Sequence, residues 1–118
     1  MDSAQITSLV TALEKFHDLD PKMPIRQVIY LLALAQQKEP VGISEMAELV
    51  GVGVAVASRY AASYGRGGRT DAGLGFLVAK EDPNDWRKKQ LVFTDAGRKF
   101  IENLFESEDK NAHIQEGK

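Results

Sequence analysis

The sequence predicts a mainly α-helical domain that carries one small β-hairpin. Apolar residues recur at intervals of three and four in several segments, which is the spacing of one face of an α-helix. Two runs of strand-forming residues, 76–80 and 91–94, flank a polar segment with Pro, Asn and Asp, which is the pattern of an antiparallel hairpin and its turn. With 118 residues the chain can build one hydrophobic core, so we expect a single domain.

The composition excludes several classes of protein. Hydrophobic residues make up 43% and charged residues 27% of the chain, which is ordinary for a globular protein. We expect a cytoplasmic protein with no membrane partner, because no leader and no apolar run of about 20 residues is present. The absence of cysteine excludes disulfides and thiolate sites, and no ligand cluster or nucleophile motif points to a metal, a cofactor or an enzyme.

Positive charge is concentrated in the middle of the chain. Residues 51–99 carry nine Lys and Arg against five Asp and Glu, although the whole chain has a net charge of −2. A basic patch on an acidic body can bind phosphate while the acidic remainder weakens non-specific adhesion.

Two helices open the chain. The first is expected over 3–17, with an apolar face that must be covered by its own domain or by a second copy. Pro24 fits the first turn of the second helix, and Pro40 follows its end. After a short extended piece, Ser44 is expected to cap a third helix over 45–50.

Spacing around Gly51 predicts a helix-turn-helix. Small Ala47 and Ala57 lie where two helices would approach, and Gly51 falls at the left-handed turn position. The second helix would run from about Val54 to Tyr64, although an ordinary pair of packed helices has the same pattern. Its outward face would carry Ala55, Val56, Ser58, Arg59 and Ser63.

Residues 65–75 contain five glycines and two arginines, which predicts a mobile loop rather than a packed element. The run lacks the Lys-Ser/Thr pair and following helix of a phosphate-binding loop. Arg66 and Arg69 could contact DNA phosphates or could only keep the loop soluble.

The polar segment 82–90 is expected to be the hairpin tip and to hold Trp86, Arg87, Lys88 and Lys89 away from the core. A solvated hairpin would also tolerate these charges. A helix-turn-helix followed by a two-stranded wing, however, forms a DNA-binding unit in which the helix enters the major groove and the wing reaches the backbone or minor groove.

A last helix, capped by Thr94 or Asp95, is expected over 95–106, and 107–118 is expected to be a disordered tail. The apolar stripes of the two ends predict a dimer interface, with packing of both helices inside one chain as the alternative. The candidate interface residues are Ile6, Leu9, Val10, Leu13, Phe16, Phe100, Ile101, Leu104 and Phe105.

Two motifs resemble the MarR family of winged-helix transcription regulators. Asp85-x-Arg87 is similar to the wing motif of that family, and Thr94-x-x-Gly97-Arg98 is similar to the start of its dimerisation helix. The likeness spans roughly residues 20–105.

The resemblance implies a winged helix-turn-helix with a DNA-binding core over 20–95 and N- and C-terminal dimerisation helices. It also implies a homodimer on double-stranded DNA with an inverted repeat. Arg87 would enter the minor groove, oriented by Asp85, and Ser58 and Arg59 would contact the major groove. Here the chain departs from the family, because apolar residues at 55–57 make hydrogen-bonded base readout sparse.

We therefore expect a sequence-specific DNA-binding regulator, with the effector, if one exists, unidentified. The alternative is a winged-helix adaptor that binds a protein through Trp86 and has no affinity for DNA.

Overall fold

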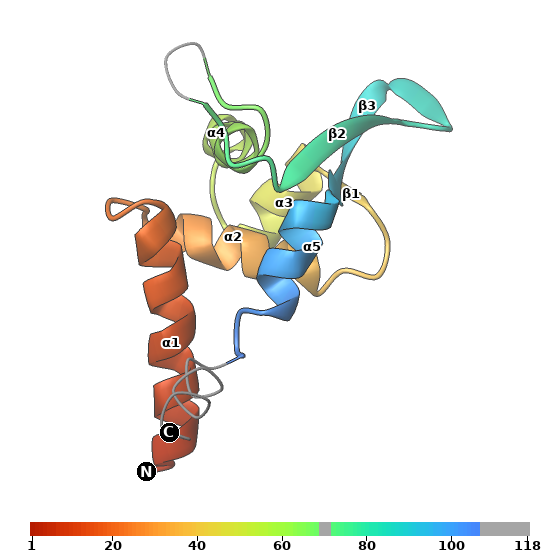
Figure 1. Cartoon of the computed structure of the whole chain (residues 1–118). Helices are drawn as coiled ribbons and strands as arrows, with labels where there is room; N and C mark the ends of the chain where they lie inside the picture. The colour runs from red at the N-terminus through yellow and green to blue at the C-terminus, as the bar shows by residue number, and fades with distance from the viewer. Residues whose placement is uncertain (69–71, 107–118) are drawn as a thin grey trace.

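The computed structural model describes residues 1–68 and 72–106, and for 86–88 it describes the backbone alone. Over these residues the chain forms five helices and one three-stranded antiparallel sheet (Figure 1), so the predicted fold class is confirmed. The elements are α1 (Ser3–Leu19), α2 (Ile25–Ala35), β1 (Val41–Gly42), α3 (Ile43–Val50), α4 (Val54–Tyr64), β2 (Leu77–Asp82), β3 (Asp85–Phe93) and α5 (Asp95–Glu102).

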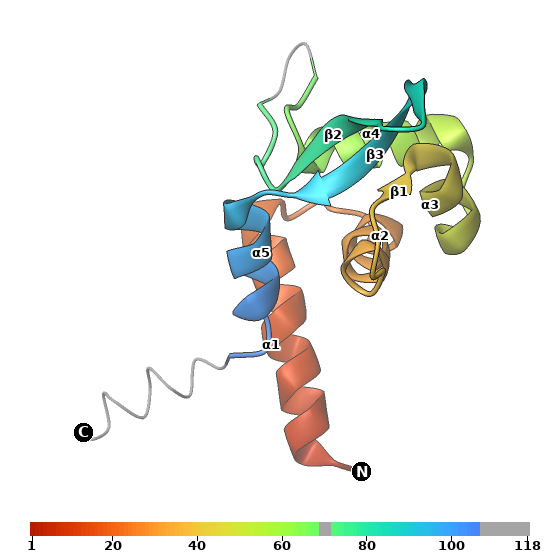
Figure 2. The same ribbon diagram turned by 90° about the vertical axis from the view of Figure 1, so that its right-hand side faces the viewer.

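One long helix stands apart from a compact body. α1 extends away from α2, α3, α4 and the sheet, so its N-terminal end lies opposite α4 and the hairpin (Figures 1 and 2). The core lies between α2, α3, α4 and the sheet, and it continues to the C-terminal half of α1 and the residues after α5. Its largest fully buried side chains are Tyr30, Tyr64, Phe16, Leu31, Met46, Leu77 and Leu104.

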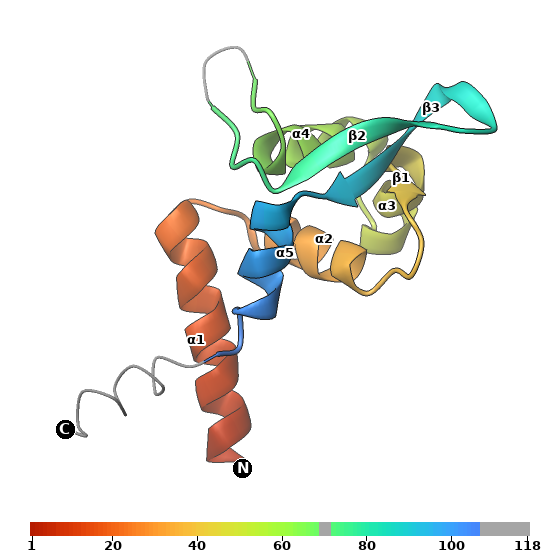
Figure 3. The ribbon, with the colours of Figure 1, turned by 45° about the vertical axis from the view of Figure 1, so that its right-hand side comes forward.

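The two ends of the chain pack on each other where α1 meets α5. The Phe16 and Phe100 rings form a T-shaped pair with centroids 5.1 Å apart, and Phe100 stacks on Phe76 at 4.9 Å. Lys15 of α1 donates hydrogen bonds to the backbone carbonyls of Asn103 and Glu106, beyond the end of α5. These contacts fix the base of α1 against the body (Figure 3).

The predicted start of α3 is wrong. α3 begins at Ile43, directly after β1, and Ser44 lies inside it. The backbone N–H of Gly42 donates to the Glu45 carboxylate at 2.8 Å. Since Glu45 satisfies this donor at the helix start, the helix begins without a Ser44 cap.

The hairpin is also longer than predicted. β3 takes in residues that were expected at the tip, and only Pro83 and Asn84 separate the strands. The Asp82 side chain accepts from the backbone N–H of Asn84 at 2.8 Å, which closes the turn. β3 also pairs with β1, giving the order β1-β3-β2.

The described part of the glycine-rich segment, 65–68 and 72–75, is hydrogen-bonded at its base, and the prediction of a mobile loop for its tip lies outside the described residues. Its described residues form a bridge between Gly67 and Ala72, and Gly73 donates from its N–H to the Arg66 carbonyl at 3.1 Å. A Cβ at Gly73 would overlap the backbone of Gly65 and Gly67. Gly73 therefore serves close packing, whereas a Cβ at Gly68 would meet no atom within 4 Å.

Candidate nucleic-acid interface

The second helix of the helix-turn-helix, α4, presents one face to solvent. Gly51 ends α3 with a φ of 78°, in the left-handed region, and the turn leads directly to α4. Ala57, Ala61 and Tyr64 are buried, so α4 packs through this stripe on the body. The opposite face carries an outer stripe that is exposed except for half-buried Ala62, and it consists of Val54, Ala55, Ser58, Arg59 and Ala62.

Hydrogen bonds to α2 fix the rotation of α4. The buried Tyr64 hydroxyl donates to the Gln27 carbonyl at 2.6 Å, and the Gln27 amide donates to the Ser63 hydroxyl at 3.0 Å. Burial, with a smaller contribution from Tyr60, raises the pKa of Tyr64 well above its ordinary value. Ser63 therefore faces α2, and its predicted place on the outward face is wrong.

The wing places Lys89 on the same side of the sheet as α4. In the β2–β3 register Ala79 pairs with Leu91 and Glu81 with Lys89, so these residues share the face that covers α4. The Lys89 ammonium lies 4.0 Å from the Glu81 carboxylate, and both side chains are more than half exposed. Such an exposed pair is weak, so Lys89 can exchange Glu81 for a phosphate.

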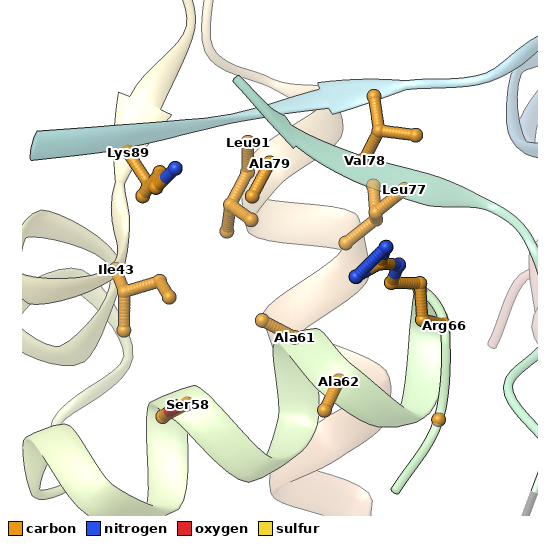
Figure 4. A pocket seen from close by; sticks show the side chains of 12 residues that line it. Ile43, Ser58, Ala61, Ala62, Arg66, Leu77, Val78, Ala79, Lys89 and Leu91 are labelled. Atoms are coloured by element: carbon orange, nitrogen blue, oxygen red, sulfur yellow. The ribbon is translucent and has the colours of Figure 1, made fainter. Parts of the chain in front are cut away.

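A groove of about 630 Å³ separates the outer part of α4 from the sheet. Figure 4 shows Arg66 and Lys89 on opposite sides of it, with Ser58 and Ala62 along α4 below. The apolar side chains that line it include Ile43, Ala61, Leu77 and Leu91. The groove thus has two cationic side chains at its rim, which come from segments more than 20 residues apart.

The structure brings together one part of the predicted DNA-binding set. Ala55, Ser58, Arg59, Arg66 and Lys89 are exposed around α4 and the groove. Val56 and Asp85 are half-buried. The other predicted residues lie outside what the structure describes. This applies to Arg69 as a whole and to the side chains of Trp86, Arg87 and Lys88.

Sequence reasoning missed two residues of the outer stripe, Val54 and Ala62. Val54 is 55% exposed at the first position of α4. Both positions follow from helical periodicity, because each lies four residues from Ser58.

The predicted dimer interface separates into two groups. Ile6, Leu9, Val10 and Leu13 form an exposed stripe on α1, the α1 stripe, and Phe105 is also exposed. Phe16 and Leu104 are buried inside the single chain, and Phe100 and Ile101 are half-buried against its core. Phe16 and Leu104 are thus enclosed within one chain, and Phe100 contacts the Phe16 and Phe76 rings, which agrees with the alternative of packing inside one chain.

No metal-binding cluster of His, Cys, Asp or Glu occurs among the described residues. In the same part of the chain, no helix combines the length and the apolar character needed to cross a membrane.

Comparison with solved structures identifies the fold. The transcriptional regulator Tm0710 from Thermotoga maritima superposes with a TM-score of 0.68 and 21% identity, covering 92% of this chain and 70% of that one. The MarR-like regulator Tm0816 of the same organism superposes with a TM-score of 0.55 and 20% identity, covering 99% of this chain and 92% of that one. CouR from Rhodococcus jostii RHA1, solved with bound p-coumaroyl-CoA, superposes with a TM-score of 0.58 and 20% identity, covering 86% of this chain and 66% of that one.

The sequence matches no protein-family model and no curated protein. The structural likeness nevertheless shows that the chain has the MarR-like winged-helix fold that the sequence motifs implied.

Proposed function

We propose that this chain is a sequence-specific DNA-binding transcriptional regulator that acts as a homodimer. α4 would enter the major groove, and the β2–β3 wing would reach the minor groove or the backbone. The observation that carries the proposal is the single surface made by the outer stripe of α4, Arg66 and Lys89. The regulators that share this fold support the same function.

The distribution of charge on this surface suits DNA. Arg59 lies in the second turn of α4, where a recognition helix meets base edges, and its guanidinium can bind guanine through two hydrogen bonds. Arg66 and Lys89 flank the groove between helix and wing, so they are suited to the phosphates that run between the major and minor grooves. We include Arg87 and Asp85 of β3 in the proposal on the strength of the wing motif.

The α1 stripe supports the homodimer. It lies at the end of the molecule opposite α4 and the wing (Figure 3), so a second copy on α1 would leave both DNA-binding surfaces free. A two-fold axis through this contact would present two α4 helices to the half-sites of an inverted repeat.

The test is fluorescence-anisotropy binding to a pool of random-sequence duplexes at two salt concentrations, with the mass in solution measured in parallel. We expect a dimer whose affinity falls steeply with salt and which enriches an inverted repeat. Absence of DNA binding at low salt would contradict the proposal and would favour the protein adaptor, whose partner should then be lost on Trp86→Ala.

Single substitutions separate base readout from phosphate contact. Arg59→Ala should weaken binding to the selected operator by about 1–3 kcal/mol and relax specificity at one base pair. Lys89→Ala should weaken binding to all sequences alike and reduce the salt slope by about 1.

Lys80→Ala is the matched control, because Lys80 is exposed on the other face of β2 and pairs with Gln90. It should change the affinity and the salt slope less than Lys89→Ala does. Equal effects of the two lysines would show that the groove face of the wing is not the DNA contact.

A further inference from the structure

The outer stripe of α4 is poor in hydrogen-bonding groups for a surface that reads bases. Three of its five side chains, Val54, Ala55 and Ala62, are aliphatic, and only Ser58 and Arg59 can donate or accept. Close packing on the body accounts for the small side chains of Ala57 and Ala61 on the inner face. It does not account for Val54, which is exposed. Val54 and Ala55 belong to the first turn of α4, which leads a recognition helix into the groove.

The turn before α4 leaves this end of the helix accessible. Gly53 precedes Val54, and a Cβ built at Gly53 or Gly51 would have no atom within 4 Å. Val54 itself is 55% exposed, so its side chain is accessible to a surface that approaches this end of α4. Val54 is β-branched and holds few rotamers, so it presents its methyl groups at little cost in side-chain entropy.

Base edges in the major groove differ in how well they accept an aliphatic side chain. Adenine, guanine and cytosine present polar atoms there, and covering these without a hydrogen bond is unfavourable. Thymine alone adds a C5-methyl group, which gains from apolar contact. An aliphatic first turn therefore favours thymine over the other bases.

We infer that Val54 and Ala55 select thymine by contact with its C5-methyl group. The half-site would carry thymines opposite the first turn of α4 and a guanine opposite Arg59, which lies one turn further along the helix. This inference rests on the proposed function, and it specifies which bases the same surface would prefer.

The experiment removes the methyl group from the DNA and leaves the protein unchanged. Each thymine of the selected operator is replaced by deoxyuridine, which keeps all hydrogen-bonding groups, and affinity is measured by fluorescence anisotropy. We expect one or two thymines per half-site at which the replacement raises the dissociation constant about fourfold, the value of one buried methyl group. Replacement of thymines outside the half-sites should have no effect.

A double-mutant cycle assigns the contact to Val54. In Val54→Ala the penalty for deoxyuridine at the sensitive position should fall toward onefold, because the side chain that contacts the methyl group is shortened. Ile29→Ala is the control, because it shortens an exposed aliphatic side chain on a different helix, α2. It should keep the full penalty for deoxyuridine.

The outcomes distinguish this inference from the proposed function. Specific DNA binding that is indifferent to deoxyuridine at every position overturns methyl readout and leaves the regulator standing. A sensitive thymine whose penalty persists in Val54→Ala and in Ala55→Gly overturns the assignment to the first turn of α4. Failure to enrich any sequence overturns both proposals together.

Discussion

At the scale of single residues, two buried tyrosines differ in whether the hydroxyl has a partner. The Tyr64 hydroxyl donates to the Gln27 carbonyl at 2.6 Å. The Tyr30 hydroxyl is buried and has no hydrogen-bond partner among the described residues, although its ring forms a T-shaped pair with Tyr60 at 5.5 Å between centroids. A buried polar group without a partner reduces stability, so the two hydroxyls should have opposite effects.

We predict that Tyr64→Phe lowers the free energy of unfolding by about 1–2 kcal/mol, because it removes the hydrogen bond to α2. Tyr30→Phe should leave it unchanged or raise it by up to about 1 kcal/mol, since only an unpaired hydroxyl is lost. Urea denaturation at pH 7 measures both. A larger loss in Tyr30→Phe than in Tyr64→Phe would mean that the Tyr30 hydroxyl has a partner.

Tyr30 also makes the stability of the fold depend on pH. Burial raises the pKa of Tyr30 to about 12, against about 10 in an unfolded chain. Between pH 10 and about 12 the unfolded state loses this proton while the folded state keeps it. The free energy of unfolding is therefore unaffected by this group below pH 10 and falls as the pH rises to about 12. Tyr30→Phe should therefore lose less stability than the parent chain in this window, and parallel curves would contradict the burial of Tyr30.

At the scale of elements, the junction between the wing and α5 explains the Thr94-x-x-Gly97 spacing. The Thr94 hydroxyl donates to the Gly75 carbonyl at 2.6 Å and accepts from the Gly97 N–H at 3.1 Å, which caps α5. The Thr94 N–H donates to the Phe76 carbonyl at 2.9 Å. A Cβ at Gly97 would overlap that carbonyl, so only glycine lets α5 lie this close to the start of β2.

We predict that Gly97→Ala lowers the free energy of unfolding by about 1–3 kcal/mol, because backbone rather than a flexible side chain must move. This loss would exceed the gain of about 1 kcal/mol in helix propensity. Gly68→Ala is the control, since nothing lies within 4 Å of its added Cβ, and it should change stability by less than about 0.5 kcal/mol. Similar stabilities in thermal or urea unfolding would contradict the close approach of α5.

At the scale of the whole molecule, the fold separates an apolar end from a basic surface. α1 carries its exposed stripe at one end, while α4 and the wing lie at the other (Figure 2). The contacts of Phe16 and Lys15 with α5 and the residues after it tie α1 to the body. The angle between α1 and the body would therefore set the distance between the two α4 helices of the proposed dimer.

We predict that Leu9→Glu raises the dissociation constant of the dimer at least about tenfold, because two copies of a charge would be buried at a two-fold contact. Leu49→Glu on α3 is a matched control, since Leu9 is 56% and Leu49 54% exposed. Sedimentation equilibrium measures both variants. Equal self-association of Leu9→Glu and the parent chain would exclude the α1 stripe as the dimer contact.

The sequence by itself determined the fold class and the presence of the local elements, but not all their ends, since α5 stops at Glu102 and not at the expected residue 106. Helical periodicity predicted α1 and α2, Gly51 identified the turn before α4, and the spacing from Thr94 to Gly97 marked the start of α5. These features depend on residues close together in the chain, whose backbone preferences and apolar spacing are readable without a partner. For the same reason the resemblance of motifs was enough to predict the fold.

Only the tertiary structure decided which apolar and polar side chains face solvent. Phe16 and Val54 are both apolar residues of helices, yet Phe16 is buried in contact with Phe100 of α5 and Val54 is exposed at the start of α4. Ser63 faces α2 because Gln27 lies opposite it, and Arg66 meets Lys89 across a groove because the sheet folds over α4. Burial and proximity depend on residues distant in the chain, so local periodicity does not determine them.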